Sequence, residues 1–317
     1  MKNQTFKCPA ISVVMPLYNK EHEIARAIKS VLSQTFTDFE IIVVNDGSTD
    51  KGPAIVKSLG DPRMRIIDQS NVGVSAARNR GISEAKAELV AFLDADDEWE
   101  PDFLETIMRL RDKFPSCDVF ATNYCFCRAD NCRRQTIIRG LPHGFREGLL
   151  TDYFMVAAQS DPPLSSSSVA VTKRAIESIG GFPVGIAAGE DLLTWARLAI
   201  RYDLAYAVEP KAFFWEPVEL PKRFPDDQDI VGRELQVLLR TYIGPNSKGL
   251  SDYVALWHRM RASIYIRLGR RWSALKEIQK AASFSGVNLK LFAYSVLTIL
   301  PKSLFINLLE FRRHSFS

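Results

Sequence analysis

The 317-residue chain has few of the features that mark secreted or membrane-spanning proteins. Its first ten residues, MKNQTFKCPA, are polar, so no secretory signal peptide is predicted. No run of about 18 apolar residues occurs, so no ordinary transmembrane helix is expected. The five cysteines are odd in number and include no C-x-x-C pair, which disfavours a zinc site and favours reduced thiols. We therefore predict a cytoplasmic protein.

Positive and negative charges are unevenly spread along a chain of ordinary globular composition. Hydrophobic residues make up 46% and charged residues 25%. Residues 1–210 carry 24 Lys and Arg against 28 Asp and Glu, whereas residues 211–317 carry 17 against 9. An acidic front with a basic tail predicts two kinds of partner, a metal-bound substrate and an anionic surface. Nucleic-acid binding is not supported, because the basic residues form no single face.

Lysine and arginine are absent where negative charge is densest. Asp94, Asp96 and Asp97 follow the apolar run at residues 89–93, yet no basic residue occurs between Lys86 and Arg109. Carboxylates so close together repel one another, and a buried unpaired carboxylate is costly. A divalent cation with oxygen ligands, Mg²⁺ or Mn²⁺, is the sharper prediction for this stretch.

Strand-like and helix-like stretches alternate through the first hundred residues. Apolar runs at residues 11–15, 39–44, 64–67 and 89–93 predict strands, the first of them stopped by Pro16, and the stretches at 21–34, 53–59 and 75–87 predict helices. This alternation indicates an α/β fold with a mostly parallel sheet, in which ligands bind beyond the carboxyl ends of the strands. Further on, residues 128–163 are predicted to be irregular loops.

The C-terminal third changes to helical patterns. We predict a catalytic domain at 1–220 and a helical region at 221–317. Within the segment 286–317, residues 289–311 are largely apolar, and the basic residues Lys290, Lys302, Arg312 and Arg313 flank the apolar stretches. This pattern favours an interfacial helix pair on an anionic membrane. The alternative is a C-terminal helix docked on the rest of the protein.

Five ordered motifs resemble the inverting nucleotide-sugar glycosyltransferases of family 2, which have the GT-A fold. They are SVVMPLYN (12–19), VVNDGSTD (43–50), NVGVSAARNRGI (71–82), FLDADDEWEP (92–101) and IGGFPVGIAAGEDLLTWARLA (179–199). The resemblance covers roughly residues 10–215. It implies a nucleotide-sugar donor bound at the sheet edge with a divalent metal.

The first two motifs imply contacts with the nucleotide base. Tyr18, just beyond Pro16, resembles the residue that stacks on uracil in the family, and an aromatic face suits a planar base. Asp46 resembles the residue that reads the uracil edge. On local grounds Tyr18 could instead pack beneath its loop, and Asp46 could form an Asx turn or cap the next helix.

The third motif implies contacts with the diphosphate. Asn71 and Gly73 lead into a helix that carries Arg78, and both a helix N-terminus and a guanidinium suit phosphate. Arg78 could instead pair with the carboxylates at the strand ends.

The last two motifs imply the metal site and the catalytic base. Asp94 and Asp96 resemble the family's D-x-D motif, whose carboxylates hold the metal against the diphosphate. Asp94 is expected nearer the ribose and Asp96 as the main metal ligand, while Asp97 is expected to cap the next helix. In the family, the aspartate of an E-D pair takes the acceptor's proton, which assigns this role to Asp191 and a supporting role to Glu190. Acidic residues also favour a helix's first turn, which is the alternative.

This sequence departs from the family pattern at two places. A histidine often found after the strand that follows the E-D helix is absent, and Glu216 stands near that point. The Q-x-x-R-W signature of processive members is also missing, which favours transfer of a single sugar.

The resemblance therefore implies a metal-dependent inverting transferase, active on the inner face of the cell membrane. It would pass a sugar from a UDP-sugar or another nucleotide-sugar to a lipid-linked or cell-surface glycan. A non-catalytic scaffold of the same fold is the alternative. A nucleotidyltransferase is disfavoured, because MPLYNKEHE lacks the glycines of a phosphate loop.

Overall fold

The computed structural model describes residues 8–128, 133–216, 225, 228–242, 244, 247–286 and 289–299. The chain forms two compact units. Unit 1 comprises Met1–Phe126, His143–Thr151 and Leu164–Trp215, and unit 2 comprises Cys127–Pro142, Asp152–Pro163 and Glu216–Ser317. The domain boundary that we predict at residue 220 lies outside the described residues.

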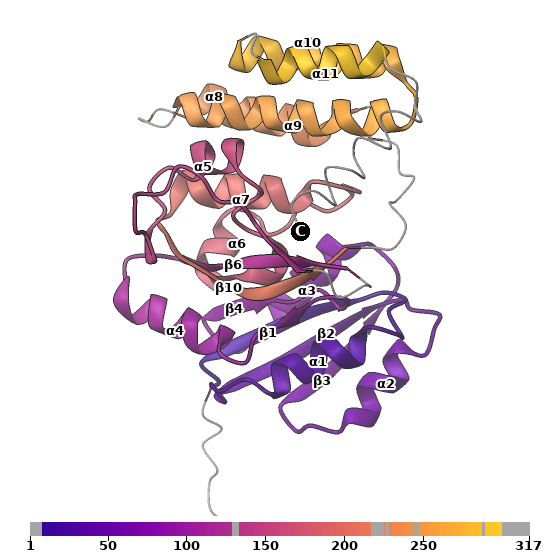
Figure 1. Ribbon diagram of the computed structural model, residues 1–317. Coiled ribbons are helices and arrows are strands. Elements are labelled where there is room, and N and C mark those ends of the chain that lie inside the picture. The colour runs from indigo at the N-terminus through magenta and orange to yellow at the C-terminus, as the bar shows by residue number, and fades with distance from the viewer. Residues whose placement is uncertain are drawn as a thin grey trace, which may run out of the picture. The chain divides into compact units, whose positions relative to one another are not determined.

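Unit 1 is built on a twisted sheet, of which Figure 1 labels β1, β2, β3, β4, β6 and β10. The strand order is β3-β2-β1-β4-β9-β6-β10-β5, with β8 beside β10. The strands β1, β2, β3 and β4 pair in parallel, whereas β9 runs antiparallel to both β4 and β6. The prediction of an α/β fold with a largely parallel sheet is confirmed. The strand bounds are β1 (Ile11–Leu17), β2 (Phe39–Asp46), β3 (Met64–Gln69), β4 (Leu89–Phe92), β5 (Glu98–Trp99), β6 (Val119–Cys127), β8 (Glu147–Leu149), β9 (Val169–Thr172) and β10 (Leu204–Trp215).

Helices cover both faces of this sheet. Alternate residues of β1 point to opposite sides, and all of them are buried, so both faces need a covering layer. Ile11, Val13 and Met15 join one apolar core with α1, and Val14 points the other way, toward α3. There a side chain at Gly81 would clash with Val14, so α3 packs closely against β1. The bounds are α1 (Ile24–Leu32), α2 (Gly52–Leu59), α3 (Val74–Glu84), α4 (Phe103–Lys113), the 3₁₀ turn η1 (Ser166–Ser168), α6 (Lys173–Ser178) and α7 (Glu190–Arg201).

Pro16 does not end the first strand, contrary to the sequence prediction. It lies inside β1, opposite Val44 of β2. The pairing of β1 with β4 stops at Val14. Backbone polar groups two residues apart in a strand point to the same neighbouring strand, so the nitrogen of Pro16, like the carbonyl of Val14, points toward the β4 side. The missing N–H of Pro16 therefore removes no ladder bond, so the strand continues to Leu17.

Unit 2 is mainly helical. Its elements are β7 (Arg133–Gln135), α5 (Tyr153–Gln159), α8 (Ile230–Thr241), α9 (Ser247–Arg267), α10 (Arg271–Ser285) and α11 (Leu289–Ile299) (Figure 1). Small residues let α9 and α10 pack closely, with Ala255, Ala262 and Ala281 fully buried in their shared core. The prediction of irregular loops at 128–163 missed α5, whose run YFMVAAQ is too short to show a helical period. No helix in the part of the chain that the structure describes has the length and apolarity needed to cross a membrane.

Candidate active site

The carboxyl ends of β1, β2 and β4 form one edge of the unit 1 sheet because these strands run parallel. Leu17 at the end of β1 lies opposite Asn45 of β2. Tyr18 follows β1 directly, Asp46 is the last residue of β2, and Asp94 lies two residues beyond β4. Three of the predicted site residues thus come to the same edge from separate segments.

Tyr18 and Pro16 differ in exposure although they lie two residues apart. The Tyr18 residue is 49% exposed, so its ring is open to solvent and not packed beneath the loop. Pro16 is buried within β1. A planar ligand could therefore stack on Tyr18, whereas Pro16 shapes the strand end from inside.

Asp46 holds the loop that leads into α3. Its Oδ1 accepts hydrogen bonds from the Gln69 side chain (2.8 Å) and the Val72 N–H (2.9 Å), and its Oδ2 accepts one from the Gly73 N–H (2.8 Å). The residue is 3% exposed. Asp46 therefore organises the entrance to α3, a helix further along the chain than α2. The sequence alternative had Asp46 capping the next helix, which is α2 and has Lys51 as its N-cap. Oδ2 can still accept a second donor.

Two glycines shape the same loop. Gly47 has a φ of +71°, and a Cβ there would lie 2.9 Å from the backbone nitrogen of Asn71. Gly73 has a φ of +100° and open space where a side chain would lie. The turn after β2 can thus touch Asn71, and the entrance to α3 is left uncovered at Gly73.

Arg78 of α3 joins the D-x-D and E-D motifs. Its guanidinium donates to both carboxylate oxygens of Asp94 (2.7 and 3.0 Å) and to Oε1 of Glu190 (3.3 Å). Its side chain is only 3% exposed and lies over the ring of Phe182. Arg78 is therefore paired with a strand-end carboxylate, as one of the two sequence interpretations proposed, and links segments about a hundred residues apart.

Asn79, the next residue of α3, fixes the backbone that precedes α7. Its side-chain amide donates to the Phe182 carbonyl (2.8 Å) and its amide oxygen accepts from the Phe182 N–H (2.8 Å). A Cβ at Gly181 would lie 2.5 Å from that amide oxygen, so this contact requires glycine. Adjacent residues of α3 thus hold the E-D segment by charge and by backbone bonds.

Glu190 and Asp191 form the first turn of α7, after Gly189 in a left-handed conformation (φ +84°). Asp191 Oδ1 accepts a bond from the Leu192 N–H (2.7 Å). Burial and the charge of Asp191 raise the pKa of Glu190 to about 7 against the opposing effect of Arg78. Burial also raises the pKa of Asp191, again opposed by Arg78. The carboxyl group of Glu190 can therefore exchange protons near neutral pH.

Asp96 is paired with a cation from a distant part of the sequence. Lys20 Nζ lies 2.6 Å from Asp96 Oδ2, and Arg26 donates to the Asp96 backbone carbonyl. Burial lowers the pKa of Lys20, but the bond to Asp96 and its charge outweigh it and raise that pKa, so Lys20 stays charged. The cations missing between residues 86 and 109 thus come from α3 and from the segment after β1.

Asp97 does not cap the next helix, contrary to the sequence prediction. That position is occupied by Asp102. The Asp97 carboxylate is buried, accepting bonds from Ser167 Oγ (2.5 Å) and the Trp215 N–H (3.0 Å), and burial raises its pKa. The residue therefore ties the loop after β4 to η1 and to the end of β10.

Glu216, which stands where many family members have a histidine, is paired with a cation of unit 2. Its Oε2 lies 3.0 Å from Nε of Arg128.

The sequence model described as "Glycosyl transferase family 2" matches residues 12–174, more than half of the chain. The chain belongs to glycosyltransferase family 2. The match covers the segments that carry Tyr18, Asp46, Arg78, Asp94 and Asp96, and it ends before the E-D pair of α7.

Curated relatives match part of this family 2 chain. The uncharacterized glycosyltransferase YibD of Escherichia coli K12 is 42% identical over 138 residues, 43% of this chain and 38% of the relative. The chondroitin synthase of Pasteurella multocida is 38% identical over 121 residues, 37% of this chain and 12% of the relative. The matches thus span well under half of these relatives' lengths.

Solved structures share the fold of this family 2 chain at low sequence identity. S. aureus TarS (residues 1–349) in complex with UDP-GlcNAc is 19% identical, has a TM-score of 0.67 and is matched over 90% of this chain and 83% of its own. The mannosyltransferase PcManGT of Pyrobaculum calidifontis, in complex with GDP-Man and Mn²⁺, is 19% identical, has a TM-score of 0.55 and is matched over 98% and 89%. These likenesses confirm the GT-A fold.

The D-x-D motif of this family 2 chain has donor chemistry that fits a divalent metal. Asp96 is 35% exposed at its side chain, and only Oδ2 is bonded to Lys20. Asp94 has both oxygens on Arg78. Mg²⁺ in nucleotide sites commonly takes one or two carboxylates and completes its shell with phosphates and water. Asp96 is thus the better placed of the two predicted metal ligands.

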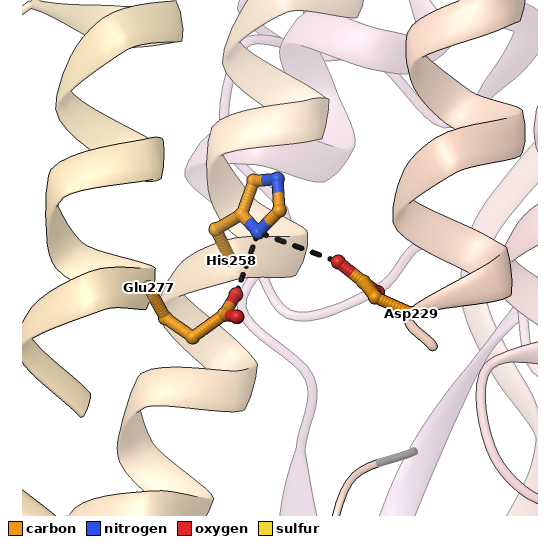
Figure 2. Close-up of side chains that lie close together, drawn as sticks. All are labelled: Asp229, His258 and Glu277. Carbon is orange, nitrogen blue, oxygen red and sulfur yellow. Dashed lines mark hydrogen bonds and ion pairs between the residues drawn. The ribbon is translucent and has the colours of Figure 1, made fainter. Parts of the chain in front are cut away.

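A second acidic cluster, which sequence reasoning missed, lies inside unit 2. Figure 2 shows Asp229 before α8, His258 of α9 and Glu277 of α10 pointing toward one another. His258 Nδ1 lies 2.7 Å from Glu277 Oε2 and 3.9 Å from Asp229 Oδ2. Among the described residues, this is the group of at least three His, Cys, Asp or Glu residues whose potential ligand atoms all lie within 4.8 Å of one another.

Two cations already balance the carboxylates of this unit 2 cluster. Arg261 lies 3.3 Å from Glu277 and 3.4 Å from Asp229, and Lys280 lies 3.1 Å from Glu277. Although burial raises the pKa of Glu277, the bond to His258 and the charge of Arg261 lower it to about 2. A metal would have to displace these cations, so the cluster serves to join three helices. The only local sequence signal is Asp229, whose carboxylate caps α8 through the Gly232 N–H.

Proposed function

We propose that the chain transfers a single sugar from a UDP-sugar, or another nucleotide-sugar, to a glycan or lipid-linked acceptor with inversion at the anomeric carbon. The acceptor class follows from the polysaccharide synthases among its relatives, such as the chondroitin synthase of Pasteurella multocida. The UDP-type donor is supported by the fold neighbour TarS, whose structure contains UDP-GlcNAc.

The observation that carries this proposal is the meeting of three segments at one sheet edge. Tyr18 is exposed there, Asp96 is accessible, and Arg78 joins Asp94 to Glu190. A base-stacking surface, an oxygen ligand and a pair of carboxyl groups with raised pKa values are the parts that direct displacement by a hydroxyl requires.

The proposed reaction starts at Asp191. Its carboxylate takes the proton of the acceptor hydroxyl while that oxygen attacks the anomeric carbon from the side opposite the nucleotide. The bond between the anomeric carbon and the β-phosphate oxygen breaks, and its electrons remain on the departing diphosphate. Glu190, paired with Arg78, orients the acceptor beside Asp191.

Charge on the departing diphosphate needs stabilisation at the D-x-D motif. Asp96 would hold Mn²⁺ or Mg²⁺, which supplies positive charge to the phosphate oxygens. Asp94 is kept in place by Arg78, near the position proposed for the ribose.

The proposed site of action is the cytoplasmic face of a membrane, reached through the C-terminal region. In α11, Leu291 is buried in the core shared with α9 and α10, which fits the docked alternative, while Phe292 is 63% and Val296 41% exposed. One face of α11 is thus docked and its other face offers apolar side chains. Of the predicted surface segment 286–317, residues 287–288 and 300–317 lie outside the described part of the chain.

Flotation with anionic vesicles tests the membrane proposal. Protein lacking residues 286–317 should stay at the bottom of the gradient, while the whole chain floats. If the truncated protein floats equally well, the C-terminal segment is not the contact.

Calorimetric titration of UDP, with and without Mn²⁺, tests the nucleotide and metal site. UDP should bind more tightly with Mn²⁺, and Asp96→Asn should lose that dependence while remaining folded. Metal-independent binding that the substitution leaves unchanged would remove Asp96 from the site. UDP binding without any sugar transfer to glycan acceptors would favour the scaffold alternative.

A further inference from the structure

Lys20 occupies a position that a metal ion at Asp96 would need. Its Nζ lies 2.6 Å from Asp96 Oδ2, although the two residues are 76 positions apart in the chain. Their side chains are 38% and 35% exposed, so an ion from solvent can reach the pair. An ammonium and a divalent ion cannot share one carboxylate oxygen without repulsion.

The backbone around Lys20 is held in place by the loop after β2. Asn19, with a φ of +50°, accepts a bond at Oδ1 from the Thr49 N–H (2.8 Å). The Glu21 N–H donates to Asp50 Oδ2 (2.8 Å). Asparagine tolerates the left-handed conformation better than most residues. Both neighbours of Lys20 are therefore anchored, and its side chain starts from a fixed point.

The other cations near Asp96 bond to groups other than its carboxylate. Arg26 donates to the Asp96 backbone carbonyl, lies 3.4 Å from Glu98 and stacks over the Trp215 ring. Arg78 is bonded to Asp94. Within the described residues, the cation on the Asp96 carboxylate itself is Lys20.

We propose that Lys20 is the resident counter-ion of Asp96 and competes with the divalent metal for it. The inference rests on the proposed metal site. A metal ion that binds Asp96 in the absence of nucleotide must leave the Lys20 ammonium without its anionic partner. When the nucleotide diphosphate is present, the displaced ammonium gains another anion, so metal and nucleotide strengthen each other's binding. Lys20 would thus keep the site from holding a metal tightly until the donor arrives.

The expected change in affinity is moderate, because a half-exposed ion pair is a weak competitor. Lys20→Met should bind Mn²⁺ about five- to tenfold more tightly than the native chain in the absence of nucleotide, from loss of the pair and of repulsion by a neighbouring positive charge. UDP should tighten Mn²⁺ binding less in Lys20→Met than in the native chain. Lys20→Arg, which keeps the charge, should resemble the native chain.

Electron paramagnetic resonance of free Mn²⁺ measures these affinities without any assay of activity. The full chain is titrated with Mn²⁺, with and without UDP, as native protein, Lys20→Met and Lys20→Gln, the last in case methionine impairs folding. Lys29→Met is the matched control, since it removes an exposed lysine from the adjacent helix α1. Asp96→Asn gives the Mn²⁺ bound elsewhere, for example in unit 2.

The outcomes separate this inference from the proposed function. Tighter binding by Lys20→Met and Lys20→Gln, but not by Lys29→Met, supports the competition. If the native chain binds Mn²⁺ with UDP while neither variant binds it more tightly without UDP, the inference is wrong and the metal site stands. If no protein binds Mn²⁺ beyond the Asp96→Asn level even with UDP, both are wrong.

Discussion

The chain contains two clusters of carboxylates and cations, and they differ in charge balance. In unit 1, four carboxylates (Asp94, Asp96, Glu190 and Asp191) have two cations, Arg78 and Lys20. In unit 2, two carboxylates (Asp229 and Glu277) have two cations, Arg261 and Lys280. In the first cluster the carboxyl groups outnumber the cations, whereas in the second the two numbers are equal.

The pKa values follow this difference. The pKa of Glu190 is raised to about 7, whereas that of Glu277 is lowered to about 2. Both residues are largely buried, so burial alone does not separate them. Surplus negative charge surrounds Glu190, while a histidine and two cations surround Glu277. Balanced charge suits a structural role, and unbalanced charge suits a site that binds a cation or moves a proton.

The largest effect is expected at Asp191 of the unbalanced cluster. Asp191→Asn should lower kcat by about 10²–10⁴-fold, because the amide cannot accept the acceptor's proton. UDP affinity should stay near the native value, since Asp191 lies on the proposed acceptor side. Initial rates and UDP calorimetry on the same preparation measure both quantities. A variant with native kcat would show that Asp191 is not the base.

Arg78→Met should cause the largest loss of stability. It leaves Asp94 and Glu190 without their shared cation, and breaking a buried pair in this way costs about 3–5 kcal/mol. Urea unfolding measures the change. Arg80→Met is the control, because Arg80 is half-exposed and its ion pair among the described residues is with Glu84. Its loss should be at most about 1 kcal/mol. Equal losses would mean that Arg78 does not join the two motifs.

Glu277→Gln should destabilise unit 2 by about 1–3 kcal/mol, since the amide keeps the shape but not the charge that balances Arg261. The lowered pKa of Glu277 stabilises the folded chain above about pH 4.5, and this contribution is lost as pH falls toward 2. Urea unfolding at pH 7 and pH 3 tests both statements. The variant and the native chain should differ less at pH 3, and an unchanged difference would contradict the lowered pKa.

The last expected effect is a change in the slope of stability against pH. The raised pKa of Glu190 means that its ionisation is harder in the folded chain, so stability is lost as pH rises from about 4.5 to 7. Glu190→Gln should reduce this loss by up to about 1.4 kcal/mol per pH unit. Urea midpoints at pH 5, 6 and 7 provide the measurement. Parallel curves for the variant and the native chain would show that Glu190 titrates normally.

Some residues could be placed at the sheet edge from the sequence, because their position depends only on which strand they follow along the chain. The hydrophobic pattern reveals those strands. Tyr18, Asp46 and Asp94 follow apolar strands, and the parallel arrangement then brings them together. The partners of these residues depend on contacts between distant segments. Neither the bond from Lys20 to Asp96 nor that from Arg78 to Glu190 leaves a signal in the sequence between them.

The errors have the same origin. Pro16 was expected to end a strand, but the side it faces has no partner strand at that point. Asp97 was expected to cap a helix, but its carboxylate accepts hydrogen bonds from Ser167 and Trp215, 70 and 118 residues away. The unit 2 cluster takes its side chains from three helices whose patterns show only apolar spacing and caps.

The double link from α3 to the segment before α7 has a consequence for protein engineering. Arg78 and Asn79 set the position of the E-D turn through Glu190 and Phe182. A chimera that exchanges the acceptor-side segment with a relative would keep its geometry only if the incoming segment still offers a glycine at 181 and a carboxylate at 190. Recombination at a junction between residues 84 and 164 would take α3 from one parent and the E-D segment from the other. A chimera that keeps this contact should therefore take both segments from the same parent.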